Sequence, residues 1–140
     1  MTHHSQIREL MTENPRAVDA DKPVSEAAKL MRDEDVGLTP IVEGDRLVGT
    51  LTDRDIAIRV VAEGRDPEST TVSEVASSEL VTIDPDQSLD EALRLMAQHQ
   101  VRRLPVVEED GRLVGIVAQA DVARHGDDRQ TGQVVEKISQ

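Results

Sequence analysis

The chain has 140 residues, with 28 acidic and 16 basic side chains and a formal net charge of −12. It contains no cysteine and no aromatic residue, which excludes disulfides, thiolate chemistry and base-stacking aromatic platforms. The acidic balance argues against a nucleic-acid backbone as partner, because that needs a basic face. No apolar run approaches the ~20 residues of a membrane span, and the first residues lack a secretory signal, so a soluble cytoplasmic protein is expected.

The first half of the chain alternates strand-like apolar segments with amphipathic segments of helical period. Pro23 suits the start of a helix but supplies no capping hydroxyl. Two apolar runs flank a turn-forming segment at 43–46, which predicts a hairpin. Because both runs are apolar throughout, we expect both faces of the hairpin to be covered. The predicted elements are a short helix at 7–11, a strand at 17–19, a helix at 24–31, strands at 38–42 and 47–51, and a helix at 52–61.

The second half of the chain repeats the first. A shift of 65 residues places Asp19 on Asp84 and Asp21 on Asp86, and one inserted residue makes the later shift 66. Ordered identity of this kind indicates an internal duplication. Because a unit of about 60 residues has a marginal core, we expect the copies to pack on each other as one pseudo-symmetric body. Further identical pairs are Glu26–Glu91, Met31–Met96, Pro40–Pro105, Gly49–Gly115 and Asp55–Asp121.

The second copy predicts the same order of elements. Ser88 and Glu91 have the spacing of a capping box, in which each side chain accepts from the other residue's backbone N–H. The segment at 63–71 is the predicted linker, and a C-terminal helix is expected at 132–138. The remaining predicted elements are a strand at 81–84, a helix at 89–96, strands at 104–107 and 113–117, and a helix from 118. The expected fold class is α/β (α+β), with two β-α-β-β-α motifs.

Several features together resemble a known family. They are the Asp-x-Asp before the first helix, the Val-Pro-Val type of strand, the Gly-x-x-Thr-Asp-Arg-Asp-Ile run from Gly49, and their duplication. The chain is similar to tandem cystathionine-β-synthase (CBS) domain pairs, and segments 51–56 and 99–106 resemble the stand-alone hypoxic response protein type of actinobacteria. The resemblance implies CBS motifs at 7–65 and 72–128 packed as one CBS-pair (Bateman) module, a mobile N-terminus at 1–6, and a helix or tail at 129–140.

The resemblance also implies a regulatory, non-catalytic module that binds an adenosyl ligand between the repeats and forms homodimers. In the family's pattern, Thr52 and Asp55 hold the ribose. The same spacing at a helix start is also that of a capping pair, with Thr52 as N-cap and Asp55 near the positive end of the helix dipole. In the second copy the pattern places Asp121 at the ribose, but Ala118 replaces the hydroxyl, so we expect the cap and one ribose contact to be lost.

Arg102 and Arg103 are the only adjacent basic pair in the chain. In the family's pattern, basic residues before the Leu-Pro-Val strand face a ligand's phosphates, and a guanidinium can hold a phosphate by two bonds. The first copy has Gly-Leu at 37–38 in this place. The alternative interpretation of the arginines is surface pairing with the acidic residues at 108–110.

An adenine bound to this chain would lie between aliphatic side chains and backbone. Ala17 and Thr82, at strand starts, are the predicted lining. Most other aliphatic candidates, which are Val18, Ile41, Val81, Ile83 and Val106, are expected to be core. No metal site is predicted, because the histidines His3, His4, His99 and His125 offer only one adjacent pair near the terminus. No catalytic motif is present in the sequence either.

Two functions of different classes follow. The first is a sensor of AMP, ADP, ATP or S-adenosylmethionine that requires no cofactor. The second is a ligand-free stress-response or protein-interaction scaffold with degenerate nucleotide sites. Ala118 and the Gly-Leu at 37–38 motivate the second function, and the net charge of −12 opposes polyanionic ligands at long range. An unknown protein partner fits either function, whereas direct DNA binding is disfavoured by the charge.

Overall fold

The computed structural model describes residues 5–125, and the chain divides into two compact units. The central unit is Arg16–Leu80, and the terminal unit combines the described parts of Met1–Pro15 and Val81–Gln140. The predicted C-terminal helix and tail, and residues 1–4 of the predicted mobile N-terminus, lie outside the described residues.

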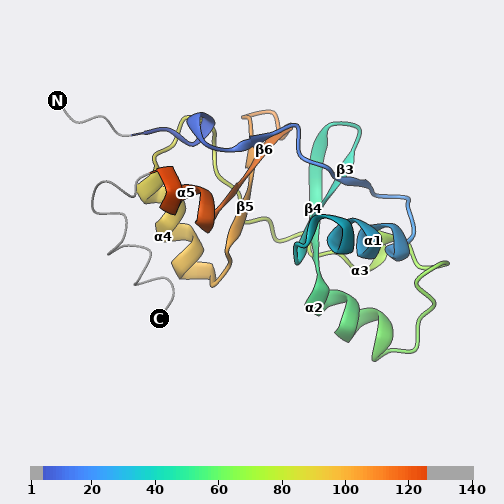
Figure 1. The fold of residues 1–140 in the computed structure, drawn as a ribbon. Coiled ribbons are helices and arrows are strands. Elements are labelled where there is room, and N and C mark those ends of the chain that lie inside the picture. Colours follow the sequence, from blue (N-terminus) through green and yellow to red (C-terminus); the bar gives the residue numbers. More distant parts are fainter. Residues whose placement is uncertain (1–4, 126–140) are drawn as a thin grey trace. The chain divides into compact units, whose positions relative to one another are not determined.

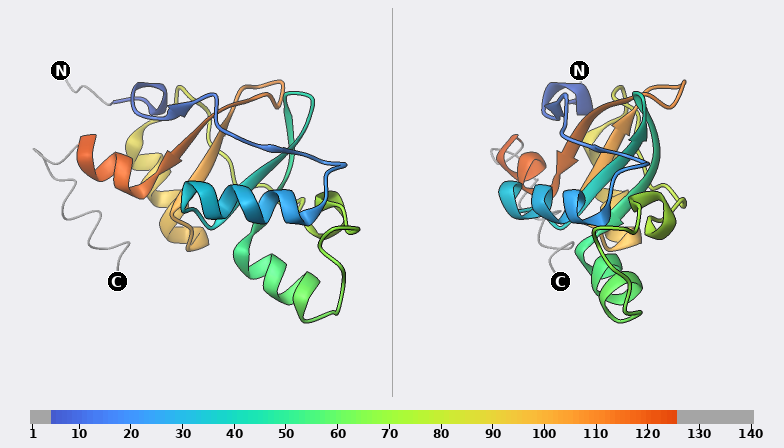
Figure 2. Two further views of the ribbon diagram at one scale, coloured as in Figure 1. Left: turned by 45° about the vertical axis from the view of Figure 1, so that its right-hand side comes forward. Right: turned by 90° about the vertical axis from the view of Figure 1, so that its right-hand side faces the viewer.

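The central unit holds a three-stranded sheet in the order β2-β3-β4 (Figures 1 and 2). β2 is parallel to β3, and β3 is antiparallel to β4. Helix α1 contacts β3 and α2, and α3 contacts β4. Buried aliphatic side chains of α1 and the sheet, such as Val24, Ile41 and Leu51, form its core. The elements are β2 (Val18–Asp19), α1 (Val24–Glu34), β3 (Leu38–Glu43), β4 (Arg46–Thr52), α2 (Asp53–Ile56), the π-helix η2 (Ala57–Val61) and α3 (Val72–Val75).

The terminal unit holds a three-stranded sheet in the order β1-β6-β5. Helices α4 and α5 contact each other, and each also contacts a strand (Figures 1 and 2). Ile7, Met96 and Leu104 are among the fully buried core residues. The elements are the 3-10 helix η1 (Ile7–Glu9), β1 (Thr12–Glu13), α4 (Leu89–His99), β5 (Arg103–Val107), β6 (Leu113–Ala118) and α5 (Gln119–His125).

The duplication seen in the sequence extends to details of the backbone. Both hairpins shift register at the same point, after Ile41 in β3 and after Val106 in β5. The first long helix of each copy ends on a left-handed residue, Asp35 with φ 55° and Gln100 with φ 56°. The two hairpins and the two long helices therefore fold alike in both copies, as their sequences predict.

The two units exchange their opening segments. The η1–β1 segment begins the first copy but belongs to the terminal unit, where β1 pairs with β6. Residues 72–78 begin the second copy but belong to the central unit, where Ser77 bridges to Thr50 of β4. The anchoring hydrogen bonds are equivalent, because Ile7 donates to the Gln87 carbonyl and Val72 donates to the Lys22 carbonyl. Each sheet is therefore completed by residues from the other copy.

Residues just before the exchanged segments accept from the N-termini of the long helices, whose first N–H groups have no partner within the helix. The Val24 N–H donates to the Thr70 carbonyl at 2.8 Å, and the Leu89 N–H donates to the Ser5 carbonyl at 3.3 Å. Pro23 occupies the N-cap of α1 without a side-chain cap, in agreement with the prediction. Backbone carbonyls thus supply what the proline cannot.

The capping box predicted for α4 is half formed. The Ser88 hydroxyl accepts from the Glu91 N–H at 3.2 Å. The Glu91 carboxylate instead pairs with Arg94 one turn further on. This arginine holds the pKa of Glu91 below its ordinary value, since a cation favours the charged form of a carboxyl group.

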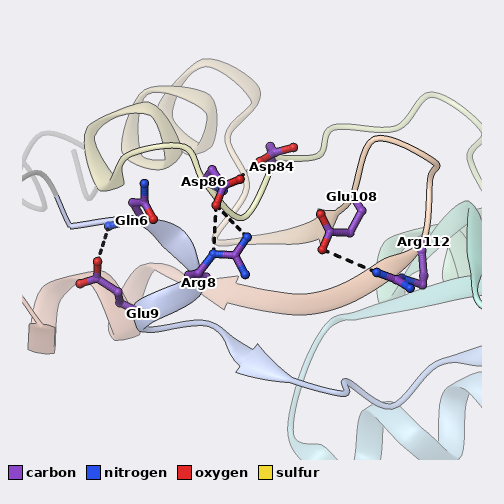
Figure 3. A network of polar contacts seen from close by, with 7 residues as sticks. All are labelled: Gln6, Arg8, Glu9, Asp84, Asp86, Glu108 and Arg112. Carbon is purple, nitrogen blue, oxygen red and sulfur yellow. Dashed lines mark hydrogen bonds and ion pairs between the residues drawn. The ribbon is translucent and has the colours of Figure 1, made fainter.

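Arg8 fixes the exchanged η1 segment to the loop before α4 (Figure 3). Its Nε and Nη2 atoms donate to Asp86 Oδ1 at 2.9 and 2.7 Å. This pairing raises the pKa of Arg8 above its ordinary value. Both side chains are about half exposed or more, so the pair adds little to stability.

Five expectations from the sequence differ from the structure. The strand expected at 81–84 is reduced to one parallel bridge between Ile83 and Val106. The opening helix is a single 3-10 turn, and the helix after β4 continues as a π-helix. Helix α3 follows the predicted linker and was not foreseen. The hairpin faces are covered unequally, because alternate residues of β4 are only half-buried. Within residues 5–125, no helix is long and apolar enough to cross a membrane.

Candidate functional site

In the central unit, the predicted binding residues gather at one end of the sheet. Leu38 at the start of β3 lies opposite Thr52 at the end of β4. Ala17 directly precedes the Val18–Ile41 pair at the start of the parallel strand β2, and it is half-buried. Asp55 lies in α2, directly after Thr52 begins the helix.

In the terminal unit, the other predicted residues gather at the equivalent end. Arg103 at the start of β5 lies opposite Ala118 at the end of β6. Thr82, also half-buried, directly precedes the Ile83–Val106 bridge. Arg102 and Asp121 flank the same point, since the Arg102 carbonyl accepts from the first N–H of α5, that of Gln119, at 2.8 Å. In the central unit the Gly37 carbonyl accepts from Asp53 in the same way, at 3.0 Å.

Thr52 and Asp55 form a complete capping box. The Thr52 hydroxyl accepts from the Asp55 N–H, and Asp55 Oδ2 accepts from the Thr52 N–H, both at 3.0 Å. The capping interpretation of the motif is therefore correct. It leaves Asp55 Oδ1 without a backbone donor among the hydrogen bonds of residues 5–125.

Asp121 makes the carboxylate half of the same box. Its Oδ2 atom accepts from the Ala118 N–H at 3.2 Å. The expectation that Ala118 removes the cap is therefore only half correct, because the alanine removes the hydroxyl but keeps the backbone donor. Both aspartates use Oδ2 for the cap and leave Oδ1 to other partners.

An arginine on the same helical segment faces each of these Oδ1 atoms. Arg59 Nε lies 3.9 Å from Asp55 Oδ1, at i,i+4 spacing. Arg124 Nη2 contacts Asp121 Oδ1 at i,i+3 spacing. Sequence reasoning missed both arginines, although three- and four-residue spacing on a helix is a signal for such pairs.

Arg102 and Arg103 do not form the surface pairs that were the alternative to phosphate binding. Glu108 instead faces Arg112 at 3.6 Å. Within residues 5–125, no ion pair involves the Arg102 or Arg103 side chain; Arg102 is exposed and Arg103 is half-buried. The two guanidinium groups and the Thr52–Asp55 box belong to different units.

The possible adenine-lining residues differ in their burial. Val18, Ile41, Ile83 and Val106 are each at most 5% exposed and belong to the unit cores. The half-buried Val81, Ala17 and Thr82 keep accessible surface. Among residues 5–125, no group of three or more His, Cys, Asp or Glu side chains could hold a metal ion. His3 and His4 lie outside the described residues.

The family model for the CBS domain matches residues 7–62 and again residues 72–128. The chain belongs to the CBS domain family. The two matches start at the exchanged segments, at η1 and at α3. Each CBS sequence motif therefore begins with residues that complete the sheet formed mainly by the other motif.

Two curated relatives match most of the chain. The CBS domain-containing protein YhcV of Bacillus subtilis is 50% identical over 119 residues, which cover 85% of this chain and 84% of YhcV. Hypoxic response protein 1 of Mycobacterium tuberculosis is 42% identical over 132 residues, which cover 94% of this chain and 92% of that protein. This chain is thus similar to stand-alone CBS proteins, as predicted.

Solved structures show the same fold. The structure of hypoxic response protein I with two coordinated zinc ions has a TM-score of 0.79 at 43% identity, covering 86% of this chain and 98% of that one. The CBS domain pair of MJ0100, in complex with 5′-methylthioadenosine and S-adenosyl-L-methionine, has a TM-score of 0.75 at 25% identity, covering 90% and 98%. CBSX2 in complex with AMP, at 24% identity and a TM-score of 0.76 over 88% and 96%, matches in fold.

Proposed function

We propose that this protein is a non-catalytic regulatory module that binds an adenosyl ligand, either AMP, ADP, ATP or S-adenosylmethionine. The MJ0100 complex carries the proposal, because a CBS pair that covers nearly the same length holds two adenosyl compounds. The likeness to a hypoxic response protein supports a role in a stress response. The family resemblance supports a homodimer, for which sedimentation equilibrium gives the mass.

The proposed contacts follow the chemistry of each group. Asp55 has one carboxylate oxygen left by its cap, which suits it to accept from a ribose hydroxyl. Arg102 and Arg103 offer planar forks for phosphate oxygens. Ala17 and Thr82 supply small, half-buried surfaces for the base. Asp121 likewise keeps Oδ1 outside the cap, but Arg124 donates to that atom and the neighbouring hydroxyl is absent.

Calorimetric titration of the full chain with adenosine, AMP, ADP, ATP and S-adenosylmethionine tests the proposal. Asp55→Asn keeps an oxygen for the cap but removes the charge, so it should weaken the binding of every adenosyl compound by about 10-fold or more. Asp53→Asn removes the same charge two residues away and is the matched control. Replacing Arg102 and Arg103 together by alanine should weaken the binding of AMP and ADP but leave the binding of adenosine unchanged.

The outcomes separate the parts of the proposal. Lack of binding by the wild-type chain for all five compounds contradicts the function itself. Binding that is equal in Asp55→Asn and wild type contradicts the ribose assignment. Equal losses for adenosine and AMP in the double arginine variant contradict the phosphate assignment.

A ligand-free interaction scaffold is the second candidate function. Two observations favour it: the capping box gives Thr52 and Asp55 a structural role without a ligand, and η2 exposes Ile58 by 47% and Val61 by 70%. This function predicts no binding of the five compounds together with a stable protein complex. Such a complex should be lost on Val61→Glu without loss of the fold.

A further inference from the structure

Arg59 contacts both a candidate ligand-binding carboxylate and the end of an exchanged helix. Its Nε atom lies 3.9 Å from Asp55 Oδ1, and its Nη1 atom donates to the Val75 carbonyl at 3.1 Å. Val75 is the last residue of α3, so its carbonyl is one of those that a helix leaves without an internal partner.

The two oxygens of Asp55 have separate partners. Oδ2 accepts from the Thr52 N–H at 3.0 Å, whereas Oδ1 faces Arg59. A ribose hydroxyl arriving at this carboxylate would therefore bind Oδ1, which has lone pairs for both the hydroxyl and the guanidinium. The Asp55 side chain is only 20% exposed, so a ligand hydroxyl and Arg59 would both have to contact the small accessible part of its carboxylate.

We propose that Arg59 is a positioning residue that couples occupancy of Asp55 to helix α3. The inference rests on the proposed function, because it needs a ligand at Asp55. Arg59 orients Oδ1 for the ligand, and a ligand that fixes Oδ1 in turn fixes Arg59 against Val75. Coupling between two sites is reciprocal, so loss of the contact between Arg59 and α3 must also lower the affinity for the ligand. Helix α3 opens the second copy, which makes it the element through which occupancy is reported.

The terminal unit separates these two tasks. The residue equivalent to Arg59 is His125, whose Nε2 lies 3.0 Å from the Ser5 hydroxyl in the opening segment of the chain. The Asp121 carboxylate is held by a different residue, Arg124. One side chain therefore does not link the carboxylate with the exchanged segment here. We expect the coupling in the central unit alone.

The experiment combines calorimetry with amide hydrogen exchange on the full chain, using AMP as the probe. In wild type, AMP should slow exchange at Val72, Ser73 and Ala76 by several-fold more than at the β3 amides, which report general stabilisation by the ligand. Arg59→Met should bind AMP about 5- to 10-fold more weakly and lose this extra slowing. Arg54→Met removes the same charge from α2, where the Arg54 side chain has no ion pair within residues 5–125, and should behave as wild type.

A conservative variant distinguishes positioning from general packing. Arg59→Lys keeps the charge beside Asp55 but lacks the second arm, so it should recover most of the AMP affinity without the extra slowing at α3. Arg59→Met with wild-type affinity, or with the wild-type response at α3, overturns the inference while leaving the proposed function intact. Failure of the wild-type chain to bind AMP, adenosine, ADP, ATP and S-adenosylmethionine overturns both.

Discussion

Gly49 lies directly against the backbone of Ser77 in the exchanged segment. A Cβ atom built on Gly49 would be 3.1 Å from the Ser77 carbonyl oxygen and 3.3 Å from Ala76 Cβ. A Cβ atom built on the repeat-equivalent Gly115 would also meet the other exchanged segment, 2.9 Å from Met11 Cγ and 3.1 Å from the Thr12 carbonyl oxygen. The glycine of the Gly-x-x-Thr-x-x-Asp run therefore has a structural role, because the segment from the other copy passes too close for a side chain.

Gly49→Ala should destabilise the protein by about 1–3 kcal/mol, because backbone atoms of the exchanged segment must shift. Urea denaturation gives the change in free energy of unfolding. Gly37→Ala is the control, since its Cβ would meet the Asp53 carboxylate, the exposed end of a side chain that can turn away. This variant should change stability by less than about 0.5 kcal/mol. Equal costs for the two variants would contradict the role given to Gly49.

Thr39 is fully buried, and its hydroxyl has no hydrogen-bond partner among residues 5–125. A buried hydroxyl without a partner costs free energy that an apolar group of the same shape does not. Thr39→Val should therefore stabilise the protein by about 1 kcal/mol in thermal or urea denaturation. The equivalent residue of the second copy is the fully buried Leu104, which agrees with an apolar requirement.

Thr52→Val is the matched comparison for Thr39→Val. The same isosteric change removes the N-cap acceptor of α2, so it should destabilise by about 1 kcal/mol. Opposite signs for the two threonines are the expected result. A loss of stability on Thr39→Val would show that its hydroxyl has a partner in solution.

The exchange of opening segments predicts where core mutations act. Ile7 and Val72 are both fully buried. Ile7 of the first copy lies in the terminal unit, and Val72 of the second copy lies in the central unit. Ile7→Ala should cost about 2–4 kcal/mol and speed amide exchange in β5 and β6 more than in β3 and β4. Val72→Ala should have the reverse pattern. If Ile7→Ala speeded amide hydrogen exchange more in β3 and β4, the exchange of opening segments between the copies would be contradicted.

Glu74 predicts a pH-dependent contribution to stability. The Thr71 N–H and hydroxyl, together with Arg65, donate to its carboxylate, which lowers the pKa of Glu74 below the ordinary 4.5. A carboxyl group whose pKa is lower in the folded state stabilises the fold above its unfolded pKa. That stability is lost as pH falls through the folded pKa.

Glu74→Gln should therefore be less stable than wild type at pH 7, and the difference should shrink as pH falls below 4.5. Urea denaturation across this range measures it. Glu79→Gln changes an exposed glutamate of the same unit and should show a smaller difference at neutral pH. A gap between Glu74→Gln and wild type that widens in acid has the wrong sign for this mechanism.

Local sequence signals predicted the elements that depend on local chemistry. The hairpins followed from apolar runs around a turn, and α1 and α4 from apolar residues at helical spacing. Helix α3 was missed because four residues give no periodic pattern. Its one signal was Thr71 three residues before Glu74, whose carboxylate accepts from the Thr71 N–H at 2.8 Å.

The exchange of segments could not be read from the sequence, because it depends on contacts distant along the chain. Nothing local to Ile7 indicates that it is buried beside residues more than 70 positions later. The candidate site was predicted only as a set of residues within each copy. The arginines at Oδ1 of Asp55 and Asp121 were missed because helix-surface pairs are common and carry little specificity.

The interleaved sheets have a consequence for how this gene can be divided. A fragment encoding residues 16–65 alone would lose the Ser77 bridge beside β4, and one encoding residues 81–125 alone would lose β1 beside β6. Either product would present an unpaired strand edge, which invites pairing with other chains and aggregation. Neither half of the duplication is therefore suited to separate expression, and the two copies must be engineered together.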